Sequence, residues 1–593
     1  MEAETGSVIH GLNGTIRDVH ETHPHPDGAH TNDIDLQRMA GWAMHYLIHT
    51  PRADLDYEPV FQCHPLKCPP VPTGLDVVVP CDTDARMNWE WYYMREVSGS
   101  TAGQIEEAGF HRHMLSYVQD DGAVLCHPGC YNEGDINHVY TRDEYVYHVW
   151  GATKILHALA EDYRRGGNVE SKTTARKIMR RLKALAVYPR PDQCYLPAGM
   201  GAVRQDGVPI PNYWNKMPAP LVEPLINYYL ASGDVEALDF ARQYAEGIMA
   251  GIQPDGIKIG RLAPGHFDSG HGHATLHALW GIAHLGAITG ERRYTDFAKA
   301  SLDWMLAQGT GAGWFPAAPE WATNCNETCC VSDVMSIAAL VARAGHPDYF
   351  DHVERYMRNH ISNLQFIVTP EFEAYYRELN HAAGADAVAQ GLTELRKFQG
   401  GVIGGSGLTD IENTLLGRVS GYEMFGCCAP EGMRAIYTTW SNVIDRLPQS
   451  PLGPAGVYVN LCLSRESPWG RVISHFPASG GLTVQATVND TFFVRPPHWA
   501  QRDQVTATVG TQPVPVQWSG AYVRFDGVAR GDTLTVHYPL IGFSHDVEGS
   551  WRTHAPDLHL TYQWRGNMVT AAEPAGITPM FNAWPRELPM LNA

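Results

Sequence analysis

The stretch LVEPLINYYLASGDVEALDFARQYAEGIM, residues 221–249, decides the fold class. Its first half has apolar residues at helical spacing, Gly233 interrupts them, and Asp234 begins a second amphipathic segment. Glycine directly after a helix adopts the left-handed conformation that ends many helices. The stretch therefore predicts two helices joined by a tight turn.

The same helical hairpin recurs further along the chain. HATLHALWGIAHLGAITGERRYTDFAKASLDWML occupies 273–306, and VSDVMSIAALVARAGHPDYFDHVERYMRNHI occupies 331–361. Their turn glycines, Gly290 and Gly345, continue the series of Gly233 at intervals of 57 and 55 residues. Hairpins with one period cannot bury their apolar faces singly and must stack. About 400 residues of such material favour a closed α/α toroid over an open solenoid.

The pattern changes after about Ser450 to short alternating or β-branched runs separated by Gly, Asp, Asn and Pro. Runs such as LTVQATV, TFFVRP and DTLTVHYPL have the length and spacing of antiparallel sandwich strands. The segment 448–456, rich in Pro and Gly, marks the boundary. We therefore expect a multidomain α+β chain, with a helical toroid over 1–447 that has an irregular N-terminal part, and β-sandwich material over 448–593.

Composition and charge exclude several classes of protein. The 593 residues are 44% hydrophobic and 18% charged, which is typical of a globular chain with a sizeable core. Acidic residues exceed basic ones by 64 to 44, and the net charge of −20 argues against a nucleic-acid partner. Without a signal peptide or a long apolar run, we expect a cytoplasmic protein that does not enter a membrane. The oligomeric state stays open, a homodimer included.

Two pairs of adjacent cysteines stand out among the 12 in the chain. One pair ends the run Asn-Glu-Thr-Cys-Cys at 326–330, and the other begins the run Cys-Cys-Ala-Pro-Glu at 427–431. Adjacent cysteines suit reduced thiols or a metal better than disulfides, although inert packing is the common alternative. Zinc is commonly held by thiolates, imidazoles and carboxylates. The two runs can supply four zinc ligands: Glu327, Cys329, Cys427 and Cys428.

The chain resembles the zinc-dependent cysteine glycosidases typified by β-L-arabinofuranosidases, that is, glycoside hydrolase family 127. Several short motifs occur in the right order over about residues 215–540, which makes the resemblance specific. The motifs are Gly272-His273-Ala274, Glu327-Thr328-Cys329, Cys427-Cys428 with Pro430, GVYVNL at 456–461, FVRPPHW at 493–499 and Gly531-Asp532.

The resemblance implies an (α/α)6 barrel followed by β-sandwich domains. It implies an exo-acting, retaining glycoside hydrolase that releases a terminal sugar, β-L-arabinofuranoside-like or otherwise unusual, from an oligosaccharide or glycoside. It further implies Zn²⁺ bound by Glu327, Cys329, Cys427 and Cys428, with Cys427 as the nucleophile. Zinc keeps a thiolate deprotonated at neutral pH, and sulfur can attack an anomeric carbon and later leave.

The acid/base residue of this family is a glutamate upstream of the Glu-x-Cys motif. Glu320 is the only carboxylate between Asp303 and Glu327, so we expect it to protonate the leaving oxygen and then to activate water. A solvated loop carboxylate explains Glu320 equally well. Glu431 is the substitute candidate, and its alternative is a charge in the first turn of a helix.

Four residues are expected to contact the sugar. His273 matches the pocket histidine of the family, and a neutral imidazole can donate to sugar hydroxyls. Asp84 and Arg86 lie in a run of acidic and aromatic residues that suits hydrogen bonding and ring stacking, although a helix start followed by core tryptophans explains the run equally well. Trp314 offers a further aromatic face. His271 is expected to be an ordinary structural histidine.

Other functions and a second metal site also stay open. A closed four-ligand zinc site is normally structural, which would suit a non-catalytic carbohydrate-binding or assembly protein. A polysaccharide lyase on the same toroid would need a Tyr or His base near an Arg that binds a uronate. A second zinc site is a side hypothesis, because two short cysteine pairs each have His beside the first member. These pairs are Cys63 with Cys68 and Cys126 with Cys130.

Overall fold

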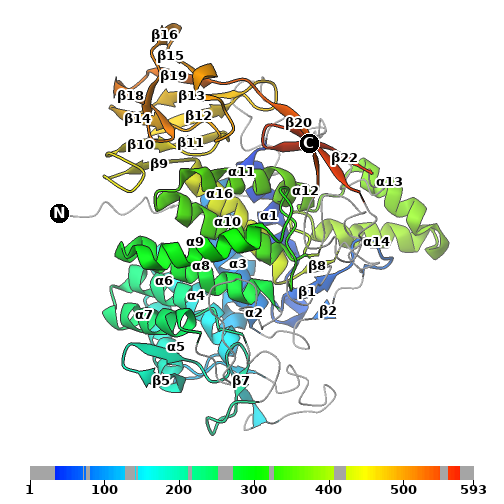
Figure 1. The fold of residues 1–593 in the computed structure, drawn as a ribbon. Coiled ribbons are helices and arrows are strands. Elements are labelled where there is room, and N and C mark those ends of the chain that lie inside the picture. The colour runs from blue at the N-terminus through cyan, green and yellow to red at the C-terminus, as the bar shows by residue number, and fades with distance from the viewer. Residues whose placement is uncertain are drawn as a thin grey trace.

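Helices fill the chain up to Val443, and strands dominate after it, as the computed structural model in Figure 1 shows. No helix in the part of the chain that the model describes combines the length and the apolar character needed to cross a membrane. The described residues are 34–70, 73–74, 81–126, 141, 144–210, 217–251, 271–318, 326–405, 423–547 and 559–574.

Six helices of the described chain form a closed inner ring. Each packs against the next one, and the last packs against the first. This closure confirms the toroid that the hairpin period predicted. The inner helices are α2 (Asp82–Ser98), α4 (Val149–Gly166), α6 (Val222–Ser232), α8 (Gly272–Thr289), α10 (Thr328–Arg343) and α16 (Cys428–Val443).

An outer helix backs each inner helix, so inner and outer helices alternate along the chain as in an (α/α)6 barrel. Gly233 and Gly290 end α6 and α8 in the left-handed conformation, with φ of 72° and 73°, as the hairpin pattern predicted. The outer helices are α1 (Leu36–His49), α3 (Gln104–Ser116), α5 (Val169–Leu185), α7 (Val235–Met249), α9 (Arg292–Leu306) and α11 (Phe350–Tyr356).

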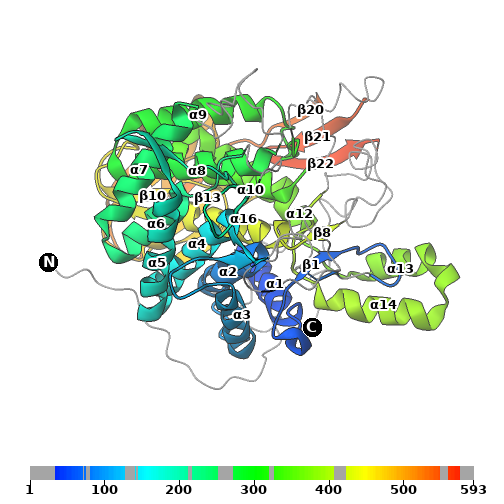
Figure 2. The same ribbon diagram turned by 90° about the horizontal axis from the view of Figure 1, so that it is seen from below.

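Additional short elements surround the ring. The π-helical turn Met357–Ile361 and α12 (Ser362–Leu364) prolong α11, and the hairpin of α13 (Pro370–Leu379) and α14 (Ala385–Lys397) extends to one side (Figure 2). Three small sheets complete the helical part. Their strands are β2 (Thr73–Gly74), β1 (Val60–Cys63) and β8 (Met424–Phe425); β3 (Leu125–Cys126), β4 (Val146–His148) and β7 (Ala202–Val203); and β5 (Val187–Arg190) with β6 (Gln193–Tyr195).

Two sheets form the sandwich that follows α16. Its first strand comes directly after the helix, so the change of structure precedes the expected boundary at 448. One sheet has the order β17 (Gln517–Ser519), β18 (Tyr522–Val528), β14 (Asp490–Val494), β10 (Gly456–Val459) and β9 (Ile444–Leu447). The other has the order β11 (Arg465–Ser467), β12 (Gly470–Ser474), β13 (Gly481–Ala486), β19 (Thr533–His537), β15 (Thr506–Val509) and β16 (Gln512–Val514).

One strand pair departs from the expected antiparallel pattern. β10 and β14 run parallel, because the intervening strands β11 to β13 belong to the other sheet and return the chain in the same direction. The remaining paired strands of the described sandwich are antiparallel. The sandwich is therefore mixed at one pair only.

A third sheet closes the described chain and packs on the toroid. It consists of β20 (Gly542–Asp546), β21 (Thr561–Arg565) and β22 (Met568–Glu573). Trp564 of β21 shares an apolar cluster with Trp314 of the helical part. The amide of Asn359 bonds the backbone of Asn567 at 2.9 Å and of Val569 at 2.8 Å. These contacts join the last strands to the ring.

Buried ion pairs dock the sandwich on α11. Asp351 accepts hydrogen bonds from Arg495 at 2.7 Å and from the backbone of His498 at 2.8 Å. Glu354 accepts one from the backbone N–H of Cys462 at 2.8 Å. Both carboxylates are buried, so these hydrogen bonds replace the ones that each carboxylate would make with water.

Candidate active site

Three thiols meet where α10 and α16 begin. The sulfur of Cys428 lies 3.3 Å from that of Cys329 and 3.8 Å from that of Cys427. Cys329 and Cys428 are buried, whereas Cys427, the residue before α16, is partly exposed. The fold thus joins two motifs that lie about a hundred residues apart, as their ligand chemistry led us to expect.

Backbone contacts around Gly404 bring the two helix starts together. Its carbonyl accepts a hydrogen bond from the N–H of Thr328 at 2.9 Å, and its N–H donates to the carbonyl of Glu423 at 2.8 Å. A Cβ atom at Gly404 would lie 2.4 Å from the ring of Phe425 and 3.1 Å from the Cβ of Cys428. Glycine is needed here because the backbone approaches so closely.

The spacing of the sulfurs fits a thiolate zinc site. Tetrahedral zinc with bonds of about 2.3 Å places two sulfur ligands about 3.8 Å apart. The three ligand atoms all lie within 4.8 Å of one another, so small shifts would give that geometry. Thiolates are also suitable ligands for zinc, whereas metals such as magnesium prefer carboxylate oxygens. The cluster is therefore compatible with a zinc site.

Cys427 is the thiol most readily ionised of the three. Hydrogen bonds from Cys329 and Cys428 lower the pKa of Cys427 well below its ordinary value, against the effect of burial, and the charge of Arg86 adds to them. Burial raises the pKa of Cys329 and of Cys428. A nucleophilic sulfur needs the thiolate form, and the lowered pKa of the partly exposed Cys427 favours that form.

Glu327 lies two residues before Cys329 in sequence, but its carboxylate is not among the ligand atoms that gather at the thiols and pairs with another residue. It precedes α10 directly, and its Oε2 lies 3.1 Å from Nε2 of His271, the residue before α8. The side chains are 23% and 20% exposed, respectively. We expected His271 to be an ordinary structural residue, yet the structure brings it beside the candidate ligand. In the sequence, His271 directly precedes the Gly272-His273-Ala274 motif, and nothing there marked it as a neighbour of Glu327.

Arg86 and His273 lie in a buried network next to the thiols. Arg86 donates to Asp82 at 2.9 Å, to Glu431 at 2.5 Å and to Nε2 of His273 at 3.0 Å. Nδ1 of His273 donates to Asp333 at 2.6 Å. Both ring nitrogens and all three guanidinium nitrogens are thus engaged within the protein. The structure places both residues in the core, bonded to protein partners, and their contact with a sugar stays a prediction.

Further paired polar side chains continue the network deeper in the ring. Arg434 donates to Asp333 at 2.7 Å and to Glu431 at 2.5 Å, and Nζ of Lys154 lies 3.3 Å from His277. Sequence alone gave no sign of these partners, because they come from four different helices. The carboxylates are Asp82, Asp333 and Glu431, and the guanidinium groups are Arg86 and Arg434, whereas burial lowers the pKa of Lys154 to about 7.

The ion pairs of Arg86 and Arg434 answer two questions about the network. His273, His277 and Glu431 have ligand atoms close enough to hold a metal, but the guanidinium groups already occupy the position of a cation. Although burial raises the pKa of Glu431, Arg434 and then Arg86 hold it below its ordinary value. Glu431 is therefore an ionised structural partner and a poor general acid.

The other expected site residues lie in three different settings. Asp84 is buried and accepts a hydrogen bond from His113 of outer helix α3 at 2.6 Å, so its carboxylate faces away from Arg86. Trp314 is 2% exposed and packs with Tyr562 and Trp564. Both side chains are buried in this structure, and their contact with a sugar stays a prediction. Glu320 lies outside the described residues.

The cysteines of the side hypothesis do not converge in the described part of the chain. Cys68 donates to the carbonyl of Ala387 at 3.4 Å, whereas Cys126 packs in a small apolar cluster with Val146. Cys63 belongs to β1, in a different sheet from Cys126. Cys130 lies outside the described residues. No metal-ligating group found among the described residues includes these thiols.

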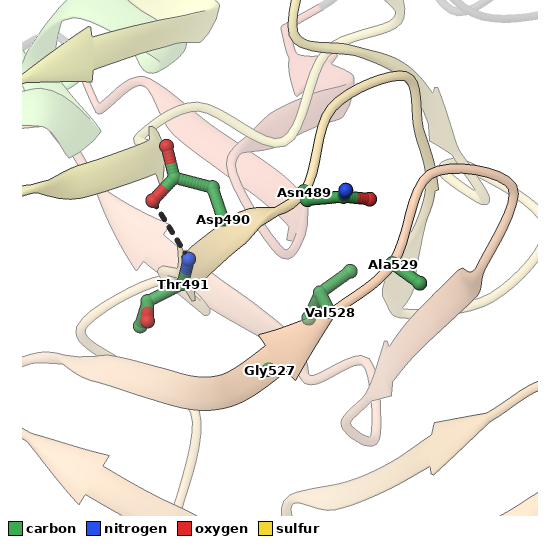
Figure 3. Close-up of a pocket in the computed structure, with 6 residues that line it drawn as sticks. All are labelled: Asn489, Asp490, Thr491, Gly527, Val528 and Ala529. Carbon is green, nitrogen blue, oxygen red and sulfur yellow. Dashed lines mark hydrogen bonds between the residues drawn. The ribbon is translucent and has the colours of Figure 1, made fainter.

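A surface hollow on the sandwich offers no comparable chemistry (Figure 3). Asp490 bonds the backbone of Thr491 at 2.8 Å and pairs with Arg446, and Asn489 accepts a hydrogen bond from the backbone of Arg530. These two polar side chains of the hollow are thus bonded to neighbouring groups of the protein. The residues that line it are Asn489, Asp490, Thr491, Gly527, Val528 and Ala529.

Comparisons with known proteins add to this geometry. No family model and no curated protein matches the sequence. A solved structure of a GH127 β-L-arabinofuranosidase from Geobacillus stearothermophilus T6 matches with a TM-score of 0.55 and 14% identity, over 89% of this chain and 80% of that one. The fold resembles that of GH127 enzymes.

Two further structures agree with this similarity. A second GH127 β-arabinofuranosidase gives a TM-score of 0.54 at 14% identity, over 91% of this chain and 81% of that one. A protein described as a glycoside hydrolase gives 0.53 at 12%, over 82% and 77%. The coverage includes both the toroid and the sandwich, so the structural resemblance expected from the motifs is confirmed at the level of the fold.

Proposed function

We propose that this chain is an exo-acting, retaining glycoside hydrolase whose nucleophile is Cys427. Its zinc ligands are Cys329, Cys427, Cys428 and Glu327. The observation that carries the proposal is the gathering of three thiols, one of them partly exposed, at the starts of α10 and α16. The GH127-like fold supports it. The substrate is a terminal sugar of a glycoside, β-L-arabinofuranoside-like or similarly unusual.

The catalytic cycle uses the sulfur of Cys427 twice. It attacks the anomeric carbon while the glycosidic C–O bond breaks, which leaves a thioglycosyl group on the enzyme. Water then attacks the same carbon, the C–S bond breaks, and the thiolate is restored. Two inversions retain the anomeric configuration. Zinc, when bound, keeps the thiols ionised at neutral pH.

Glu320 is the proposed acid and base. It gives a proton to the leaving oxygen in the first step and takes one from water in the second. The described residues on both sides of the segment that contains Glu320 lie near the starts of α8 and α10. The carbonyl of Ala317 accepts a hydrogen bond from the N–H of Gly272 at 2.5 Å, next to His271, and Asn326 directly precedes Glu327.

The buried network holds the reacting thiol in place. Glu431 lies one helical turn after Cys427, and its bond to Arg86 joins α16 to α2, while Arg434 bonds it within α16. Asp333 extends these bonds to α10, one turn after Cys329. Side chains fixed by such bonds need little rearrangement when the substrate reacts.

Activity and labelling test the proposal directly. We expect hydrolysis in a screen of aryl glycosides with zinc supplied and thiols kept reduced. A cyclitol epoxide should label Cys427 alone, as peptide mass analysis would show. A zinc-loaded protein with neither activity nor label would favour a binding or assembly protein. An unsaturated uronate product that absorbs near roughly 235 nm would favour a lyase.

A further inference from the structure

The residues before α8 and α10 make an unusual pair. A polar residue in this position commonly bonds the free N–H groups of its own helix, as His148 does before α4 by accepting from Gly151. Neither His271 nor Glu327 makes such a capping bond. Their side chains instead meet each other, with Nε2 of His271 at 3.1 Å from Oε2 of Glu327.

The backbone around His271 is tightly fixed. The next residue, Gly272, donates to the carbonyl of Ala317 at 2.5 Å. A Cβ at Gly272 would lie 3.1 Å from that oxygen and 3.3 Å from the sulfur of Cys330 in α10. The start of α8 is therefore packed directly against the start of α10, which limits where the imidazole of His271 can lie.

We propose that His271 positions Glu327 as a zinc ligand. Its Nε2–H donates to Oε2 of Glu327, and this bond restricts the orientation of the carboxylate. This inference rests on the zinc site of the proposed function. A hydrogen bond from a second residue orients ligating carboxylates, and its loss typically costs about 10–100-fold in metal affinity. His271 thus acts through Glu327, without touching the substrate.

Zinc affinity of the full chain, measured by chelator competition, tests this role. His271→Ala should weaken binding by about 10–100-fold. His271→Gln, which keeps an N–H donor, should recover most of the affinity. His284→Ala is the matched control, because His284 lies on the same helix, pairs with Glu223 at 2.9 Å and is equally exposed at 21%. It should bind zinc as the unmodified chain does.

A double-mutant comparison separates positioning from other roles. In a Glu327→Gln background, His271→Ala should have little further effect, because the two residues act as one unit. The Co²⁺ form of His271→Ala should keep its thiolate charge-transfer bands and show the altered ligand-field bands of Glu327→Gln. If His271→Ala does not fold, His271→Gln against Glu327→Gln provides the same comparison.

The outcomes distinguish this inference from the proposed function. Unchanged zinc affinity in His271→Ala would overturn it, and so would an equal loss in the Glu327→Gln background. A chain that binds no zinc at all would instead remove the proposed site. A chain with coupled His271 and Glu327 but no glycosidase activity would leave the positioning role intact and overturn the proposed chemistry.

Discussion

At the scale of single residues, neighbouring cysteines have different environments. Cys427 is partly exposed and ionises readily, whereas Cys428 is buried against Cys329. We expect Cys427→Ser to abolish hydrolysis of every substrate, because the oxygen is a poor replacement for a thiolate nucleophile. Activity should be absent even in Cys427→Ser protein that metal analysis shows to hold zinc. Cys329→Ser and Cys428→Ser should lose it, and retention of stoichiometric zinc in both would disprove the ligand assignment.

A second residue-scale prediction concerns Glu320. Removal of an acid matters least when the leaving group departs without protonation. Glu320→Ala should therefore lose far more activity on natural linkages than on activated aryl glycosides, by a factor of about 10²–10⁴. Azide should restore part of the turnover. Steady-state kinetics on both substrate classes would show this, and equal losses on both would move the acid to another carboxylate.

At the scale of helices, the network around Arg86 joins elements that are far apart in sequence. Arg86→Met removes the cation between Asp82 and Glu431 and leaves two buried carboxylates without that partner. We expect a loss of about 3–5 kcal/mol in the free energy of unfolding. Denaturant titration of the metal-free chain would measure it, since zinc would otherwise add to the stability.

An exposed arginine provides the control for this substitution. Arg180 pairs with Glu236 at the surface, where its side chain is 56% exposed. Arg180→Met should cost less than about 1 kcal/mol. Similar losses in both variants would mean that the buried network contributes no more than a surface ion pair.

At the scale of the whole molecule, we expect the docking of the sandwich on the toroid to weaken in acid. Burial opposes ionisation of Asp351, but Arg495 and His498 hold its pKa below the ordinary value. A carboxyl whose pKa is lower in the folded than in the unfolded chain stabilises the folded state in full at pH values above its unfolded pKa of about 3.9. This stabilisation is lost as the pH falls further. Asp351→Asn should therefore be less stable than the unmodified chain by a constant amount from pH 7 to 5.

Urea unfolding between pH 7 and 3 would check this expectation. The difference between Asp351→Asn and the unmodified chain should narrow below about pH 4. Asp54→Asn serves as the control, because its pair with Arg52 is exposed to solvent and should have little effect at any pH. A difference that stays constant down to pH 3 would show that Asp351 does not act through its charge.

The sequence predicted the periodic parts of this molecule well. Hairpin turns at Gly233 and Gly290 and most sandwich strands follow from local patterns, and the thiol cluster follows from the chemistry of two motifs. The first sandwich strand was missed because it continues α16 without an intervening Gly or Pro. Local patterns suffice where neighbours in sequence determine the structure.

Partners of buried polar residues could not be predicted in this way. Asp82 and Asp84 are two residues apart on one helix, yet one binds Arg86 and the other binds His113. Glu431 looked like a candidate acid until its pairing with a guanidinium 345 residues away was known. Such partners depend on which helix faces lie inside the ring, and residue type alone does not determine that.

The closure of the ring by α16 also orders events during synthesis. The ring cannot close until the ribosome has released the chain through Val443, about 350 residues after α2 begins. Until then, Cys427 and Cys428 are not available to Cys329, and the side of α2 that packs on α16 has no partner. Contacts between such distant segments form late and slowly. If the proposed site binds zinc, we expect metal capture to be one of the last steps in the maturation of the helical part, and a nascent chain stalled before residue 427 should hold no zinc at this site.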